Sequence, residues 1–391
     1  MMKFFLSVIT VFGVVIYLSI PKTSYHFGEL RTKTLKDGLV TDLKVGVVWP
    51  FSTTNNLFKE GIELAVEEIN EKGIHGRKFN IVYKDTASDQ KKAIKIAKEF
   101  VETPDMFAVM GHYDSNTVAK TSISYERAKL FYINTGALGS FLSEHNFNYF
   151  VRTSMNTDML AKKMVLALSK EGYKMVYHIT QEDSYGQDIA FNFKNYLDFM
   201  DMRICRSDSY FRWDKKFHKI IYDLRGENCD VVFVAGYEPW AWKFLSDMRD
   251  MGVTLPFVAA ATSIDSLMEI APKAAEGAMF YTYYDPHSND SNNVKFYNTF
   301  KKKYGMEPDV YAATGYDSIK MLAEAIERTK SIDPLNLVYY FKYIMHHVGV
   351  NGTYSFTSKG EVRERPFYLM KVENGKGVMV RSLEPDYNVD D

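Results

Sequence analysis

The stretch that decides the fold opens with LKVGVVW, residues 43–49, and Pro50 follows it directly. This run is rich in β-branched residues, which is typical of a buried strand that ends in a loop. Apolar residues then recur every three or four positions from Phe58 to Ile69, which predicts a helix with one face on a sheet. A strand over 79–83, a helix over 93–100 and a strand over 107–110 follow, and the last opens into a polar loop at 111–115. This alternation predicts a doubly wound α/β sheet with its ligand site at the carboxyl ends of the strands.

The composition is that of a folded protein with two domains. The chain has 391 residues, of which 46% are hydrophobic and 25% charged. Its formal net charge is −1, and no stretch combines clustered Lys and Arg with aromatics, so a nucleic-acid partner is excluded. The abundant aromatics, 27 Tyr, 27 Phe and 4 Trp, also suit a pocket that binds by stacking.

The amino terminus differs from the rest of the chain. An uncharged apolar run from Phe4 to Ile20 lies between Lys3 and Pro21, so residues 1–21 are predicted to be a signal sequence or a membrane anchor. No Ala-x-Ala cleavage site follows, and both alternatives stay open. The basic residues after the run would, by the positive-inside rule alone, keep the bulk of the chain inside. Residues 22–42 lack apolar periodicity and are predicted to be a linker.

The two cysteines, Cys205 and Cys229, can build neither a disulfide framework nor a thiolate metal site. They fall on or beside the predicted second and third strands of one lobe, which in doubly wound order flank the first strand. Bridging would then be hard, so we expect two free, mostly buried thiols.

A second set of alternating elements begins near Phe150 to Thr153, which predicts two similar lobes. Three helices without intervening strands follow the second set and are expected to cover the first lobe. The predicted division is 43–153 plus 285–352 for the N-lobe, 154–284 plus 353–382 for the C-lobe, and 383–391 for an acidic tail.

Signatures of catalysis and metal binding are missing from the sequence. There is no Gly-x-Ser-x-Gly, no Walker loop, no Gly-x-Gly-x-x-Gly and no His-Glu-x-x-His. His346 and His347 are adjacent and point apart on a helix, so they favour a surface pair over a metal site. Asp85 and Asp89 are best explained as caps of the next helix. We therefore expect no enzyme activity, no cofactor and no metal.

Polar loops at strand ends are the candidate ligand site. Tyr113, Asp114 and Ser115 precede a helix whose free amides suit a carboxylate or carbonyl, although the same residues could simply cap that helix. Tyr185 and Tyr237 occupy equivalent loops of the second set, where a core role is the alternative to a pocket role.

Several motifs in a fixed order carry a resemblance to a known family. They are KEGIELA (59–65), NEKGIHG (70–76), Asp85 with Asp89, Gly111 with Ser115, DSYG (183–186), AGY (235–237), AEG (275–277) and GYD (315–317). With these motifs the chain resembles the type I periplasmic binding proteins, in the branch of the leucine/isoleucine/valine-binding proteins, from Leu43 to about Val380.

The resemblance implies two doubly wound, flavodoxin-like lobes joined by a hinge, with the ligand in the cleft. Family members that bind amino acids hold the α-carboxylate through positions that fall here on Ser115, Gly136 and Leu138. An acidic residue after the strand at Phe257 normally holds the α-ammonium, and Ala261 stands in that region. The full set of predicted ligand-binding residues is Tyr113, Asp114, Ser115, Thr135, Gly136, Ala137, Leu138, Tyr185, Tyr237, Trp240, Ala261 and Thr262.

The function expected from this resemblance is that of an exported solute-binding protein. It would capture a small organic ligand, an amino acid or a related carboxylate or amide, and deliver it to the permease of an ABC transporter. The expected location is periplasmic or otherwise outside the cytoplasm, with residues 4–20 as a candidate anchor. Two alternatives are a membrane-anchored ligand sensor and an enzyme on the same fold.

The missing acidic residue at Ala261 bears on the ligand. A buried ammonium without a carboxylate partner costs several kcal/mol, so the sequence favours an uncharged or anionic ligand with an apolar or aromatic body. Asp114 or Glu238 could supply the charge from another direction, and that alternative stays open.

Overall fold

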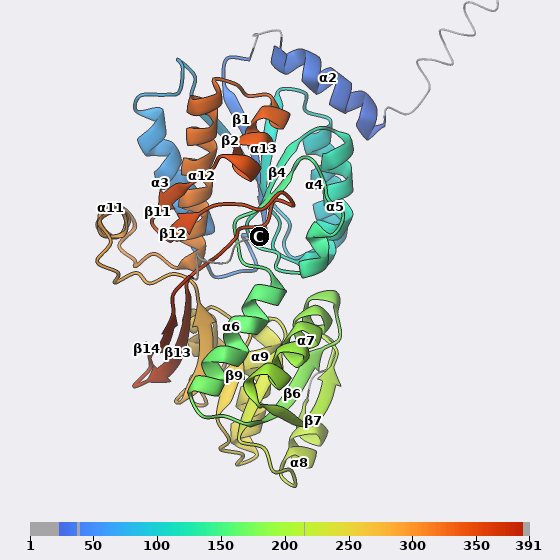
Figure 1. Cartoon of the computed structure of the whole chain (residues 1–391), viewed down its shortest axis with the longest axis vertical. Helices are drawn as coiled ribbons and strands as arrows, with labels where there is room; N and C mark the ends of the chain where they lie inside the picture. The colour runs from blue at the N-terminus through green and yellow to red at the C-terminus, as the bar shows by residue number, and fades with distance from the viewer. Residues whose placement is uncertain (1–22, 37–39, 215, 386–391) are drawn as a thin grey trace, which may run out of the picture.

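The protein consists of two α/β lobes, shown one above the other in Figure 1. The computed structural model describes residues 23–36, 40–214 and 216–385. The N-lobe sheet is parallel and has the order β2-β1-β3-β4-β5. Its strands are β1 (Leu43–Trp49), β2 (Phe79–Asp85), β3 (Met106–Gly111), β4 (Phe131–Asn134) and β5 (Phe150–Arg152).

Helices cover both faces of the N-lobe sheet. On one side α3 packs against α12, and on the other α4 packs against α5 (Figure 1). The helices of this lobe are α3 (Phe58–Asn70), α4 (Gln90–Val101), α5 (Ser115–Arg127), α11 (Ser291–Tyr304), α12 (Val310–Thr329) and α13 (Pro334–Tyr343), with a 3₁₀ turn at Ser140–Ser143 and a small hairpin of β11 (His347–Gly349) and β12 (Gly352–Tyr354). The late helices therefore return to the first lobe, as the sequence predicts.

The C-lobe sheet has the order β14-β13-β10-β9-β8-β6-β7. Its strands are β6 (Met175–Gln181), β7 (Arg203–Tyr210), β8 (Val231–Ala235), β9 (Phe257–Ala259), β10 (Ala278–Thr282), β13 (Phe367–Glu373) and β14 (Lys376–Leu383). Its helices are α6 (Thr157–Lys170), α7 (Ser184–Leu197), α8 (His218–Leu224), α9 (Glu238–Asp250) and α10 (Ile264–Ile270), with a 3₁₀ turn at Asp198–Met200. β13 pairs antiparallel with both β14 and β10, and the other pairings of this sheet are parallel. The predicted architecture of two doubly wound lobes is confirmed.

Three segments cross between the lobes, at residues 153–156, 283–290 and 355–366. Arg365 lies fully buried in the third segment. Its guanidinium carbon is 4.0 Å from the ring centroid of Tyr354 and 5.6 Å from that of Tyr283. Two of the crossing regions are thus tied together by a cation that faces aromatic rings.

The predicted linker at 22–42 is wrong for most of its length, because Ser24–Lys36 form helix α2. The buried residues of this helix are Phe27, Gly28, Arg31 and Leu35. An arginine and a glycine stand where a typical amphipathic helix has apolar residues, which is why the segment shows no apolar periodicity.

Arg31 attaches α2 to the amino-terminal edge of the N-lobe sheet. Its side chain is 0% exposed and donates hydrogen bonds to five backbone carbonyls. These belong to the end of α4 and the turn after it (Phe100, Val101 and Thr103), to the start of β3 (Met106) and to the residue after α5 (Ala128). Burial lowers the pKa of Arg31 to about 10, so the guanidinium stays charged at neutral pH.

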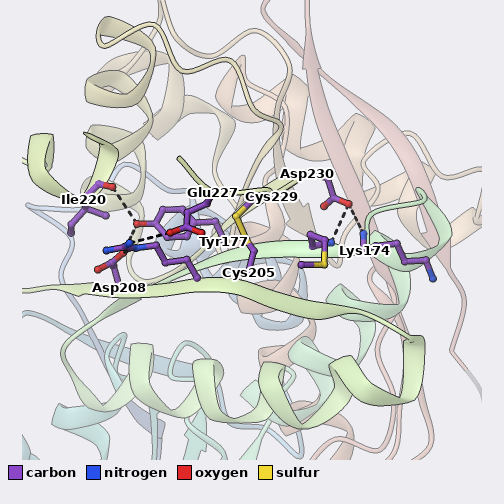
Figure 2. The surroundings of a disulfide bond; sticks show 10 residues. Lys174, Tyr177, Cys205, Asp208, Ile220, Glu227, Cys229 and Asp230 are labelled. Carbon is purple, nitrogen blue, oxygen red and sulfur yellow. Dashed lines mark hydrogen bonds and ion pairs between the residues drawn. A yellow bond between two sulfur atoms is a disulfide. The ribbon is translucent and has the colours of Figure 1, made fainter. Parts of the chain in front are cut away.

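The expectation of two free thiols is also wrong, because Cys205 and Cys229 form a disulfide (Figure 2). Their Cα atoms are 5.7 Å apart, which is within the normal range for such a bond. Cys205 is an extra residue in β7, where the register with β6 shifts, and Cys229 lies in the loop before β8. That loop crosses the amino end of β6, where Asp230 accepts hydrogen bonds from the backbone of Lys174 and Met175. The two cysteines therefore meet although β6 separates their strands.

Both ends of the chain extend outside the described residues. The apolar run 4–20, predicted to be a signal or anchor, lies outside them, and so do residues 386–391 of the predicted acidic tail. Within 23–36, 40–214 and 216–385, no helix has the length and apolar character needed to cross a bilayer.

Candidate functional site

A small cavity of about 40 Å³ lies where the carboxyl ends of the two sheets face each other. Both lobes contribute to its wall. The N-lobe supplies Tyr113, Gly136, Leu138 and Tyr311, and the C-lobe supplies Tyr185, Tyr237, Glu238, Ala260, Ala261, Thr262 and Tyr281. Cavities at such strand ends are the usual ligand sites of open α/β sheets.

Gly111 allows the loop after β3 to approach β1 closely. This residue has a φ of +116°, and a methyl group on it would collide with the carbonyl oxygen of Val48. Asp114 then caps α5 by accepting a hydrogen bond from the backbone N–H of Thr117 at 2.9 Å. Ser115 begins the helix, and its hydroxyl accepts a hydrogen bond from the N–H of Gly139 at 3.0 Å. The loop is thereby connected to the next one along the sheet.

The loop after β4 forms the wall at Gly136 and Leu138. The Asn134 side chain accepts a hydrogen bond from the N–H of Ala137 at 3.0 Å and donates one to the carbonyl of Ala137 at 2.8 Å. Arg152, which is fully buried, donates to the carbonyl of Leu138 at 2.7 Å from behind the loop. The N–H of Leu138 has no acceptor among the described residues.

The C-lobe wall is built on the starts of α7 and α9. Asp183 caps α7 by accepting from the N–H of Gly186, and the hydroxyl of Tyr185 donates to the carbonyl of Ala260 at 3.0 Å. Tyr237 precedes α9, and its N–H donates to the Gln181 side chain at 3.2 Å. Both tyrosines are therefore fixed by their own backbone or hydroxyl groups, with their rings at the cavity.

Aromatic rings connect the two walls. The ring centroid of Tyr113 lies 5.2 Å from Trp49, 6.1 Å from Tyr311 and 6.2 Å from Tyr237, and Tyr237 lies 4.8 Å from Tyr185. Burial raises the pKa of all four tyrosines, so their hydroxyls stay neutral. The hydroxyl of Tyr311 also lies 3.1 Å from that of Thr262 in the other lobe.

Glu238 is the charged residue of the small cavity. It is the first residue of α9, and its Oε1 accepts hydrogen bonds from the N–H of Thr262, the hydroxyl of Thr262 and the N–H of Ser263 at 2.9, 3.1 and 3.0 Å. Burial raises the pKa of its carboxyl above the ordinary value, and these donors offset only part of the rise.

A larger cavity of about 330 Å³ adjoins the small one and shares Tyr113, Tyr237, Glu238 and Tyr311 with it. Its other lining residues are Pro50, Thr53, Thr54, Asn55, Asn56, Thr86, Ser88, Asp89, Ala93, His112, Asp114, Thr117, Arg212, Pro239, Trp240, Ser263, Ser266, Glu269 and Ile270. Of the two basic residues in this wall, His112 is neutral and Arg212 is already paired with a carboxylate. Burial lowers the pKa of His112 to about 3, and Arg212 pairs with Asp183 at 2.7 Å.

The structure brings most of the predicted ligand residues together. Those that line the small cavity are Tyr113, Gly136, Leu138, Tyr185, Tyr237, Ala261 and Thr262, and those that line only the larger one are Asp114 and Trp240. Ser115, Thr135 and Ala137 line neither of these two cavities. They lie buried just behind the wall.

Four lining residues are absent from the predicted set: Glu238, Ala260, Tyr281 and Tyr311. Glu238 directly follows a predicted residue at the start of a helix, so its position was a usable signal. Tyr311 belongs to a helix that comes almost 200 residues after the loop it contacts, and no local pattern places it in the cleft.

Among the described residues, no cluster of three or more His, Cys, Asp or Glu side chains could hold a metal ion. The chemistry available in the cavity is thus one carboxylate, tyrosine hydroxyls and rings, and backbone amides.

Comparison with known proteins identifies relatives over most of the chain. The sequence model described as "periplasmic binding protein" matches residues 42–377. The Leu/Ile/Val-binding protein homolog 2 of Brucella abortus is 27% identical over 344 residues, which cover 86% of this chain and 91% of that protein. An amino acid binding protein of Pseudomonas aeruginosa is 26% identical and covers 83% of this chain and 88% of its own length.

Solved structures share the fold. The substrate-binding protein of an ABC transporter from Desulfitobacterium hafniense, solved with Leu, has a TM-score of 0.78 and 28% identity over 87% of this chain and all of its own. A leucine binding protein from Thermotoga maritima has a TM-score of 0.81 at 23% identity, over 88% of this chain and 99% of its own. A solute binding protein from R. palustris, solved with benzoate, has a TM-score of 0.77 at 18% identity, over 88% of this chain and 97% of its own. Proteins of this fold hold chemically different ligands, so the ligand has to be inferred from the cavity itself.

Proposed function

We propose that this chain, which belongs to the family of periplasmic binding proteins, is an exported solute-binding protein. Members of the family bind ligands and are not enzymes. In this proposal the protein captures a small organic ligand between its lobes and delivers it to an ABC transporter. The observation that carries this proposal is the cavity at the facing strand ends, whose wall comes from both lobes. A ligand held there contacts both lobes at once, so it favours the closed arrangement over an open one.

Two further features support the proposal. The disulfide between Cys205 and Cys229 suits an oxidising compartment outside the cytoplasm. The relatives named for leucine, isoleucine and valine, together with the largely aromatic wall, support an amino acid or a related carboxylate or amide as the ligand.

A thermal-shift screen of small metabolites tests the proposal, on protein that keeps α2 because Arg31 ties this helix to the N-lobe. A true ligand at about 100 times its Kd adds about 2.7 kcal/mol of stability and raises Tm by several degrees. With that ligand, small-angle scattering is expected to show a smaller radius of gyration. A profile that does not change at saturation would contradict closure, and a screen without any hit would contradict the proposed function.

We also propose that residues 4–20 keep the protein at the membrane, since the apolar run lacks a convincing cleavage site. Native protein is expected in the membrane fraction, and detergent but not high salt should release it. A mature chain that begins after Pro21, as seen by intact mass, would show that the segment is a cleaved signal instead.

A further inference from the structure

Arg365 is buried in the third crossing segment without a hydrogen-bond acceptor. Its side chain is 0% exposed, and Nε, Nη1 and Nη2 have no hydrogen-bond partner among the described residues. Its guanidinium group faces two aromatic rings instead, those of Tyr354 and Tyr283. Aromatic rings attract a cation but replace only part of the hydration that a charge loses on burial. The position is therefore costly for an arginine.

The acids around Arg365 are bound to other groups. Glu364, its neighbour in the chain, lies 2.9 Å from Nζ of Lys163 in α6. Burial raises the pKa of Asp317, and the charge of Arg365 offsets part of this rise, so the two side chains interact. The oxygens of Asp317, however, accept hydrogen bonds from the two backbone N–H groups of the turn between β11 and β12, at 2.9 and 3.0 Å. Neither acid gives Arg365 an acceptor.

The lobes are closed on each other in this structure. The hydroxyl of Ser184 in α7 donates a hydrogen bond to the Asn116 side chain in α5. The hydroxyl of Thr262 lies 3.1 Å from that of Tyr311 in the other lobe. Both contacts join the C-lobe to the N-lobe and are lost when the lobes move apart. The lack of acceptors at Arg365 thus belongs to the closed arrangement.

Other buried polar atoms of the crossing segments also lack partners among the described residues. The hydroxyl of Ser154, in the first segment, is buried without a hydrogen bond. In the third segment, Oε2 of Glu361 has no donor. The crossing segments join the two lobes (Figure 1), and they are the parts of the chain that turn when the lobes separate. The closed arrangement therefore leaves polar groups unpaired where the molecule bends.

Resting on the proposed closure, we infer that Arg365 sets the balance between the open and closed arrangements by making the closed one unfavourable without a ligand. Opening turns the crossing segments and lets water reach the guanidinium group, which then has acceptors. The open arrangement is the more populated one in the ligand-free protein, and ligand binding supplies the free energy of closure. Arg365 thereby keeps the lobes from closing on an empty cavity.

The test measures the distance between two spin labels, one on each lobe, by double electron–electron resonance on the full chain. Both cysteines form the disulfide, so the labels attach only to introduced thiols. Lys91→Cys in α4 and Lys273→Cys between α10 and β10 provide exposed sites. Without ligand, we expect the longer, open distance to dominate. Arg365→Met removes the charge and every unpaired donor, and it is expected to raise the closed-to-open ratio about 5- to 50-fold.

Two further variants show whether the unpaired donors cause the shift. Arg365→Lys keeps a buried cation with N–H donors, so it is expected to stay as open as the wild type. Arg31→Met removes another fully buried arginine, but one with five acceptors and far from the crossing segments, and it is expected to leave the distances unchanged. If Arg365→Met does not fold, Arg365→Gln, which also removes the charge, should shift the ratio in the same direction.

The outcomes separate this inference from the proposed function. A ligand-free wild type that is already closed would overturn the inference, and so would an unchanged distance distribution in Arg365→Met. A shift in Arg365→Lys as large as that in Arg365→Met would assign the effect to packing and overturn it too. In each of these cases, a metabolite that stabilises the protein in the thermal-shift screen leaves the proposed function standing. Only a screen without any hit contradicts that function.

Discussion

Replacement of Arg31 by methionine is expected to lower the free energy of unfolding by about 3–5 kcal/mol. The methionine fills part of the space but donates no hydrogen bond, so five carbonyls lose the guanidinium as a donor. Those of Phe100 and Thr103 keep a backbone N–H donor. Each buried acceptor left without a partner costs about 1–3 kcal/mol, and water that enters recovers part of this sum. Urea denaturation of the purified protein measures the change.

The control for this prediction is Lys33→Met. Lys33 is exposed in the same helix, so its replacement also exchanges a cation for methionine but loses no buried contact. We expect an effect within about 0.5 kcal/mol. If Arg31→Met were as mild as Lys33→Met, α2 would contribute little to the stability of the lobe, and the structural role of Arg31 described above would be wrong.

Gly111→Ala is expected to cost about 3–5 kcal/mol and to abolish ligand binding. The residue combines a positive φ with a collision between any added methyl group and the carbonyl of Val48. Relief of that collision requires β1 and β3 to separate or the loop to move. Either movement displaces Tyr113 from the cavity wall.

Gly172→Ala is the control for Gly111→Ala, because it tests the cost of the positive φ without a steric collision. Gly172 also has a positive φ, of 90°, but an added methyl group would meet no atom within 4 Å. Its replacement is expected to cost only about 1–2 kcal/mol and to leave ligand binding unchanged. Similar losses of stability in the two variants, seen in parallel urea titrations, would show that the close approach at Val48 is not important.

Local sequence patterns were sufficient to predict the strands that lie buried inside a sheet. The strand at 43–49 is apolar apart from Lys44 and is followed by a proline, and the structure has β1 with the same bounds. The loops after β3, β4 and β8 follow from the positions of such strands, so much of the cavity wall could be named from the sequence.

The features that were missed depend on contacts between distant segments. α2 has an arginine in its buried face, and only the carbonyls of α4, β3 and α5 make that arginine stable there. Cys229 meets Cys205 because its loop crosses the end of β6. Glu238 lies beside the loop after β9, where its carboxylate accepts a hydrogen bond from the N–H of Thr262, 24 residues further along the chain.

The place where α2 is attached also affects how the molecule moves. Arg31 binds the amino-terminal edge of the N-lobe sheet, whereas the cavity lies at the carboxyl-terminal edge, toward the other lobe (Figure 1). A force that acts on the chain ahead of Ser24 is therefore passed to the N-lobe through α2 and does not load the crossing segments. If the protein is held by its N-terminus, as proposed, the N-lobe is the stationary half, and the proposed closure is a swing of the C-lobe toward it.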